Sequence, residues 1–122
     1  MTNCAEPEGK HLIAELYECA HLDDLPLIER AMAEAAAAAQ ATLLDLRLHA
    51  FGEGHGVTGV ALLAESHISI HTWPEYGYAA VDIFLCAARH DIEAALQVLV
   101  DALAARRVER RQIIRGYPSK GV

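Results

Sequence analysis

The chain lacks a basic cluster, a membrane-length apolar run and a secretion signal. Its 122 residues carry 10 Lys and Arg against 17 Asp and Glu, a formal net charge of −7. Because nucleic-acid binding depends on clustered positive charge, this balance argues against DNA or RNA as the main partner. The uncharged apolar runs are shorter than a membrane span, and the first residues, MTNCAEPEGKH, show no signal-peptide pattern. We therefore expect a cytoplasmic protein that contacts neither nucleic acid nor membrane.

Cysteine is also scarce, because only Cys4, Cys19 and Cys86 are present. Zinc ribbons and disulfide frameworks use paired cysteines at characteristic spacings, and these three are odd in number and far apart. Neither is supported, and we expect reduced cysteines. Internal repeats and long linkers are missing as well, so the length fits a single domain over residues 1–122.

Hydrophobic periodicity predicts an antiparallel sheet with two helices. Apolar or alternating stretches predict strands at residues 11–19, 41–50, 57–64, 66–73, 78–86 and 108–115. Helices are expected at 25–40, with Asp23 or Asp24 as the cap, and at 91–105, capped by Asp91. Short links between the central strands favour antiparallel pairing, with both helices on one face. The predicted fold is α+β, a two-layer αβ sandwich whose other sheet face is solvated or covered by a partner.

Residues with reactive side chains concentrate at positions 65–86, ESHISIHTWPEYGYAAVDIFLC. His67 and His71 have a zinc-binding spacing for a helix, but the β-branched residues between them favour a strand, so we expect no metal site. Ser66 could belong to a serine–histidine–carboxylate triad, but its flanks lack the glycines of the usual nucleophile elbow. Both interpretations are therefore weak.

A third possibility is that Ser66 attacks the carbonyl carbon of Glu65, which turns the amide into an ester. This shift needs strain or oxyanion stabilisation, because an amide is normally inert. Loss of the Ser66 Cα proton would then eliminate the upstream chain, and hydrolysis of the remaining dehydroalanine gives a pyruvoyl group. Ser66 and His71 are five residues apart and would face opposite sides of a regular strand. We therefore expect a bend or bulge near Ser66, with irregular geometry at Glu65–Ser66.

Two long stretches resemble the short, pyruvoyl-dependent S-adenosylmethionine decarboxylases of bacteria and archaea. They are GKHLIAELYEC, residues 9–19, and GVTGVALLAESHISIHTWPEYGYAAVDIFLC, residues 56–86. The resemblance spans nearly the whole chain. It implies an αβ sandwich that forms a homodimer, with active sites at the interface that use residues of both protomers.

The resemblance also implies a self-processing proenzyme. Cleavage between Glu65 and Ser66 would give a beta chain, residues 1–65, and an alpha chain, residues 66–122, which begins with the pyruvoyl cofactor. His71 would take the Cα proton of Ser66 during processing. The pyruvoyl group would form a Schiff base with the substrate amine and accept electrons as CO₂ leaves. The product, decarboxylated S-adenosylmethionine, would serve spermidine and other polyamine synthesis.

Further matching residues receive roles by the same resemblance. Thr58 stands where the family has a serine that assists processing, and Cys86 would protonate the substrate carbon after decarboxylation. Glu75 would bind the ribose hydroxyls of the substrate, and Phe51 would stack on its adenine.

One loop departs from the family pattern. The family reads H-x-F-x-P-x-G-V-S-G, whereas residues 49–59 read HAFGEGHGVTG, with the proline missing and one residue added. Glu53, in this loop, could pair with the terminal cation of ornithine or arginine, which makes a decarboxylase of those amino acids the alternative. Retention of Phe51 and Glu75 favours S-adenosylmethionine. A non-catalytic relative on the same fold would be expected to lose Ser66 or Cys86, and both are present.

Overall fold

One antiparallel sheet and two helices make up the molecule, which we describe from a computed structural model covering residues 8–86 and 88–117. The sheet order is β2-β3-β4-β5-β1-β6, and each neighbouring pair is antiparallel. In chain order the elements are β1 (Glu8–Tyr17), α1 (Leu25–Ala38), β2 (Leu43–Ala50), β3 (Val57–Leu63), β4 (Ser66–Trp73), the 3₁₀ turn η1 (Pro74–Tyr76), β5 (Tyr78–Cys86), α2 (Ile92–Ala102) and β6 (Arg107–Gly116).

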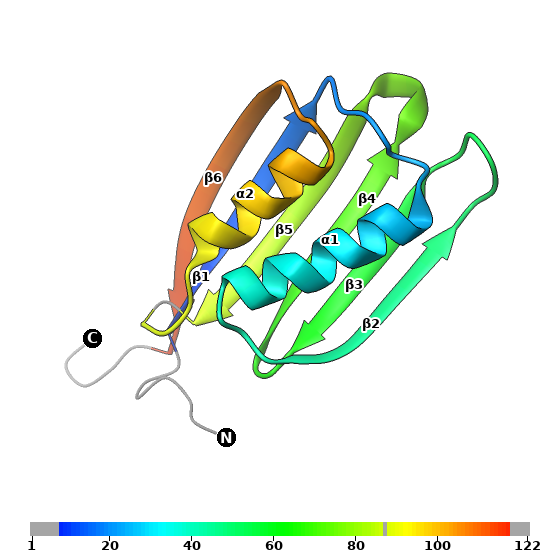
Figure 1. The fold of residues 1–122 in the computed structure, drawn as a ribbon. Helices are drawn as coiled ribbons and strands as arrows, with labels where there is room; N and C mark the ends of the chain where they lie inside the picture. Colours follow the sequence, from blue (N-terminus) through cyan, green and yellow to red (C-terminus); the bar gives the residue numbers. More distant parts are fainter. Residues whose placement is uncertain (1–7, 87, 118–122) are drawn as a thin grey trace.

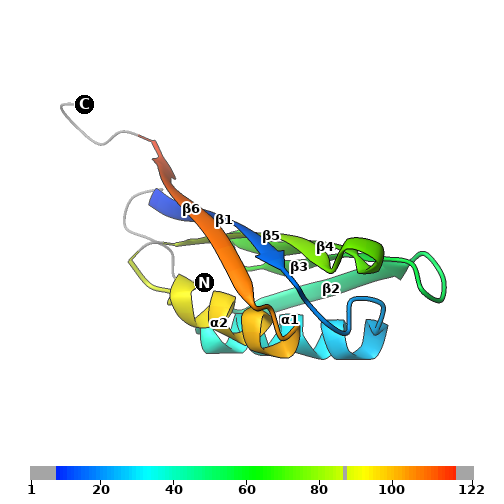
Figure 2. The same cartoon turned by 90° about the horizontal axis from the view of Figure 1, so that it is seen from above.

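The predicted α+β sandwich is confirmed. Both helices lie side by side on one face of the sheet and leave the other face uncovered, which we call the open face (Figures 1 and 2). The bounds predicted for β4 and β5 agree with the structure, and the other elements differ by a few residues at their ends. Neither helix within the described ranges is long and apolar enough to cross a membrane.

The helices begin at aspartate caps and pack through small side chains. Asp24 accepts a hydrogen bond from the Leu27 amide at 3.1 Å, and Asp91 accepts one from the Ala94 amide at 3.0 Å. The alanine-rich face of α1 is buried and lets the helix approach the sheet and α2 closely. The core lies between the layers, and its largest fully buried side chains include Leu12, Ile28, Met32, Ile68, Ile70, Ile83 and Leu99.

Strand alternation divides the sheet residues between the two faces. In β5 the odd-numbered residues Ala79 to Leu85 are buried under the helices, while Tyr78, Asp82 and Cys86 belong to the open face. Trp73 and Tyr76 are 37% and 75% exposed in this single chain. The open face carries polar and aromatic side chains of a kind that suits a site or an interface.

Both ends of the described chain lie at the same place in the sheet. Glu8, at the start of β1, is opposite Gly116, at the end of β6. The β3–β4 hairpin turn and the end of β5 lie at this end of the sheet, which we call the hairpin end. The loop of residues 51–56, η1 and the start of β5 lie at the opposite end, which we call the loop end.

Buried contacts around Thr72 attach the loop of residues 51–56 to the C-terminal end of β4. Thr72, the buried polar residue of the described core, accepts a hydrogen bond from the Val57 amide at 2.8 Å and donates one to the Leu22 carbonyl at 2.7 Å. A Cβ at Gly56 would lie 1.9 Å from the Thr72 carbonyl oxygen, so only glycine fits there. These contacts therefore join the start of β3, the end of β4 and the segment at Leu22, next to His71.

We predict that Thr72→Val destabilises the protein more than Thr72→Ser. Valine keeps the shape but leaves the Val57 amide and the Leu22 carbonyl without a partner, which costs about 1–3 kcal/mol. Serine keeps both hydrogen bonds and loses one buried methyl group, at a cost of about 1 kcal/mol. Urea unfolding of the two variants and the parent chain measures the difference. Equal stability of the two variants would show that the hydroxyl is not needed.

Candidate active site

The bond that the sequence singled out lies in a tight hairpin turn. Ala64 and Glu65 connect β3 to β4, and Leu63 pairs with Ser66 across the turn. Glu65 has φ 71°, in the left-handed region, which costs a non-glycine residue about 1–3 kcal/mol. The Ser66 hydroxyl donates a long hydrogen bond, 3.5 Å, to the Ala64 carbonyl. The predicted irregular geometry at Glu65–Ser66 is confirmed by the conformation of Glu65.

The predicted bulge in the strand itself is wrong. The pairing of β4 with β3 runs without a register shift from Ser66, opposite Leu63, to His71, opposite Thr58. The parity of the strand therefore puts Ser66 and His71 on opposite faces. Five residues at about 3.3 Å each also separate them by roughly 16 Å. A single chain does not bring these two residues together.

Cys86 lies at the same end of the sheet as Ser66. It ends β5, is half-buried on the open face and pairs with Gly9 of β1. Cys86 is disulfide-bonded in this structure, which corrects the prediction of reduced cysteines. Cys19 is free, and burial raises the pKa of its thiol to about 11. Cys4 lies outside the described residues.

Thr58 and His71 are brought together at the loop end. They are opposite one another in β3 and β4, and 3.3 Å separates Thr58 Oγ1 from His71 Nδ1. The His71 side chain is exposed on the open face, and its ring centroid lies 6.3 Å from that of Trp73. A hydroxyl next to an exposed imidazole can orient that imidazole for proton transfer.

The predicted substrate-binding residues also lie at the loop end. Phe51 is 59% exposed, and its ring meets that of His49 with 4.6 Å between centroids. Glu53 is exposed in the following loop, and Glu75 is exposed in η1. The candidate residues therefore divide into two half-sites, one with Ser66 and Cys86 and one with Thr58, His71 and these three residues.

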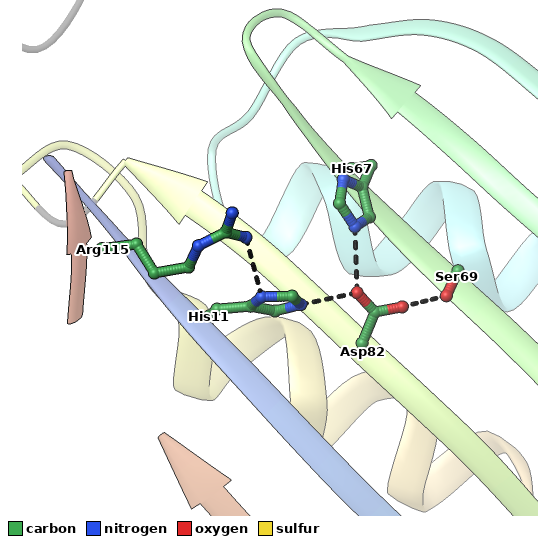
Figure 3. A network of polar contacts seen from close by, with 5 residues as sticks. All are labelled: His11, His67, Ser69, Asp82 and Arg115. Carbon is green, nitrogen blue, oxygen red and sulfur yellow. Dashed lines mark hydrogen bonds and ion pairs between the residues drawn. The ribbon is translucent and has the colours of Figure 1, made fainter. Parts of the chain in front are cut away.

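A polar network on the open face lies between the half-sites (Figure 3). Asp82 Oδ2 accepts hydrogen bonds from Nε2 of His11 at 2.7 Å and from Nε2 of His67 at 2.9 Å, and Asp82 Oδ1 accepts one from Ser69. The sequence motifs described above assign no role to His11 or Asp82. The register of β1 and β4 against β5 brings these side chains together, and the local sequence does not reveal that register.

This network has the ligand atoms of a metal site, but the proton of His11 is on the nitrogen that a metal ion would need. The ligand atoms of His11, His67 and Asp82 lie within 4.8 Å of one another. Arg115 Nη1 lies 3.1 Å from Nδ1 of His11, and because a guanidinium only donates, that nitrogen accepts. The proton of His11 is then on Nε2, where it is directed at Asp82 instead of leaving a lone pair for a cation. The arrangement favours a hydrogen-bonded cluster.

A shallow pocket of about 310 Å³ extends over the open face from this network toward His71. Glu15 and Tyr78 line it as well, and Tyr78 donates a hydrogen bond to Glu15. That hydrogen bond, together with burial, raises the pKa of Tyr78 to about 12, so Tyr78 stays a neutral donor at physiological pH. The pocket can hold a small polar molecule within reach of His71.

Acidification should weaken the fold through Asp82. Burial acts to raise the pKa of this carboxyl, but hydrogen bonds from Ser69, His11 and His67 outweigh burial and hold the pKa below its usual value. The contribution to stability is therefore present above the unfolded pKa, about 3.9, and is lost as the pH falls through the lower folded pKa. Urea unfolding at about pH 5 and about pH 3 should show a larger loss for the parent chain than for Asp82→Asn. Equal losses would rule out this linkage.

Comparisons with known proteins identify the family of this chain. The family model described as S-adenosylmethionine decarboxylase matches residues 10–116. The chain is 54% identical over 113 residues to an S-adenosylmethionine decarboxylase proenzyme of Parasynechococcus marenigrum, covering 91% of this chain and 88% of the relative. It is 47% identical over 108 residues to the proenzyme of Thermomicrobium roseum, covering 88% and 93%.

The fold matches a solved structure as well. The crystal structure of the adenosylmethionine decarboxylase from Aquifex aeolicus is 32% identical, with a TM-score of 0.83, and the match covers 97% of this chain and 98% of that one. These names support the S-adenosylmethionine interpretation and not the ornithine or arginine alternative. The chain belongs to the S-adenosylmethionine decarboxylase family.

Proposed function

We propose that this protein cleaves itself between Glu65 and Ser66 and then decarboxylates S-adenosylmethionine with a pyruvoyl group derived from Ser66. The observation that carries the proposal is the strained turn at Glu65, directly before a serine hydroxyl. Membership of the family makes the protein a carboxy-lyase. The expected fragments are residues 1–65 and 66–122.

The local geometry is suited to processing. The left-handed conformation of Glu65 has a backbone cost directly before the amide of Ser66, and the acyl shift from nitrogen to oxygen would replace that amide with a more flexible ester. A base then removes the Ser66 Cα proton, and the Glu65 carboxylate leaves with the ester oxygen. The dehydroalanine tautomerises to an imine. Water hydrolyses this imine to the ketone of the pyruvoyl group and releases ammonia. Each step needs only the serine, a base and water.

Once the bond is cut, residue 66 is a chain end. It is then free to turn from the helix side toward the open face, where Cys86 and the pocket lie. The pyruvoyl group fits this position, because residue 66 starts β4 at the same end of the sheet as Cys86. When formed, the pyruvoyl group supplies an electron sink for the electrons released with CO₂.

The separation of the half-sites is the main argument for a dimer. Ser66 and Cys86 lie at the hairpin end, whereas Thr58 and His71 lie at the loop end. A two-fold axis that lies between two facing sheets, parallel to the sheets and perpendicular to their strands, would stack two open faces with their strands reversed, so that each hairpin end meets the other chain's loop end. His71 of the partner subunit would then serve Ser66, and Phe51 and Glu75 would bind substrate across the interface.

Cys86 would supply the proton that replaces CO₂ on the substrate carbon. Its place at the end of β5 on the open face keeps it near the start of β4. A thiol is needed for this step, so the disulfide at Cys86 has to be reduced before turnover. Activity assays are therefore run with a reducing agent. Location in the cytoplasm, which keeps thiols reduced, stays a prediction that agrees with this need.

Purified protein should consist of two fragments that separate only on denaturation. Intact-mass measurement should find residues 1–65 and a 66–122 fragment that lacks a free amino terminus and reacts with hydroxylamine. The cut protein should release CO₂ from S-adenosylmethionine and not from ornithine or arginine. Ser66→Ala should stay uncut and inactive, with an unchanged fold. An uncut parent chain that lacks carbonyl reactivity would refute the proposal.

Complementation between two inactive variants tests the shared site. Ser66→Ala cannot be cut, and His71→Ala lacks the processing base, so each homodimer should stay uncut. When the two are co-expressed with different tags, the His71→Ala chain should be cut, because its Ser66 meets the intact His71 of the other chain. Mass measurement of each tagged chain reads the result. If the mixed dimer forms and neither chain is cut, the two-chain site is wrong.

A further inference from the structure

The Asp82 network ties three strands together next to the proposed cut. His67 directly follows Ser66 at the start of β4, Asp82 lies in β5, and His11 lies in β1 (Figure 3). Nε2 of His67 lies 2.9 Å from Asp82 Oδ2, and Nε2 of His11 lies 2.7 Å from the same oxygen. The side chain of Asp82 is 25% exposed and those of His11 and His67 are 18% and 36% exposed, so water competes only in part for these bonds.

The direction of each hydrogen bond follows from Arg115. Its guanidinium has no acceptor, so it donates to Nδ1 of His11, and the remaining proton of a neutral His11 is on Nε2. His67 also presents Nε2 to Asp82, and an ionised carboxylate only accepts. Asp82 is thus an acceptor for both imidazoles, and Ser69 donates to its second oxygen. The cluster has one consistent pattern of donors and acceptors.

Cleavage makes this cluster more important than it is in the intact chain. Before cleavage, the hairpin turn and the Leu63–Ser66 pair hold residue 66 from both sides. After cleavage, residue 66 is a terminus, and termini fray unless something ties them down. On the β5 side, pairing begins only at His67, opposite Phe84. The hydrogen bond from His67 to Asp82 is therefore the side-chain tie nearest to the new end.

We propose that Asp82, acting through His67, holds the cut end of β4 in place and so positions the reactive group at residue 66. This inference rests on the proposed function, because it concerns the same processed chain. Asp82 and His67 are positioning residues here, and His67 acts as a hydrogen-bond donor. Processing needs the tie less than turnover does, since the uncut hairpin already fixes Ser66.

The test compares processing with turnover in three variants. Asp82→Leu, which has a similar shape and no acceptor, and His67→Ala should be cut to the same extent as the parent chain. Their kcat per cut chain for S-adenosylmethionine should fall at least about tenfold, since small misplacements of a reacting group are costly, while KM changes less. His67→Gln should recover kcat to within about threefold, because the amide nitrogen of glutamine can replace Nε2 as the donor to Asp82.

Asp45→Asn is the matched control. It changes a strand carboxylate that accepts hydrogen bonds from Leu46 and Arg47 in β2, outside the pocket and the Asp82 network, so kcat should stay within about threefold of the parent value. Thermal melting identifies any variant that fails to fold, and the near-isosteric Asp82→Leu then decides the result with His67→Gln.

Two results would overturn the inference. A parent-like kcat per cut chain in folded Asp82→Leu and His67→Ala would show that the hydrogen bond between His67 and Asp82 is not needed. Loss of activity in His67→Gln equal to that in His67→Ala would show that the imidazole itself does chemistry. A parent chain that is never cut, or that releases no CO₂, would instead refute the proposed function, and this outcome is visible before any variant is made.

Discussion

The unbroken antiparallel pairing of β4 is the constraint on which the candidate site depends. Because β4 pairs in register with β3 from Ser66 to His71, its two reactive residues are fixed at opposite ends and on opposite faces. A bulge would have put both residues on one face, and the unbroken register excludes it. The same pairing places Thr58 beside His71 and Asp82 beside Ser69. A second chain is the simplest way to complete the site.

The two faces of the sheet have separate tasks. One face is closed by two helices whose alanines allow close packing, and this face supplies the stability of the single chain. The other face keeps its histidines, carboxylates and aromatic rings accessible, at the cost of exposing apolar side chains such as Ile13 and Ile113. Association through the open face would bury these side chains and enclose the pocket at the same time.

Local patterns predicted most of the fold, and long-range register explains what they missed. The bounds of β4 and β5, the caps Asp24 and Asp91 and the single helical face follow from periodicity and cap chemistry within a few residues of sequence. The strain at Glu65 was expected from the parity of Ser66 and His71, although its form, a left-handed turn residue instead of a bulge, was not. The link between His11 and Asp82 spans 71 positions and depends on the pairing of β1 with β5, so no local pattern could indicate it.

The meeting of Glu8 and Gly116 on neighbouring strands makes the described chain almost a closed ring. A proposed cut at the β3–β4 hairpin, at the same end of the sheet, would open that ring at a second point and remove few backbone hydrogen bonds, since the turn residues lie outside the strand ladder. The architecture would then accept a new beginning at residue 66 for the same reason that many folds accept circular permutation, namely that the native contacts do not depend on where the covalent chain starts. The uncut chain would therefore already have the fold of the cleaved enzyme.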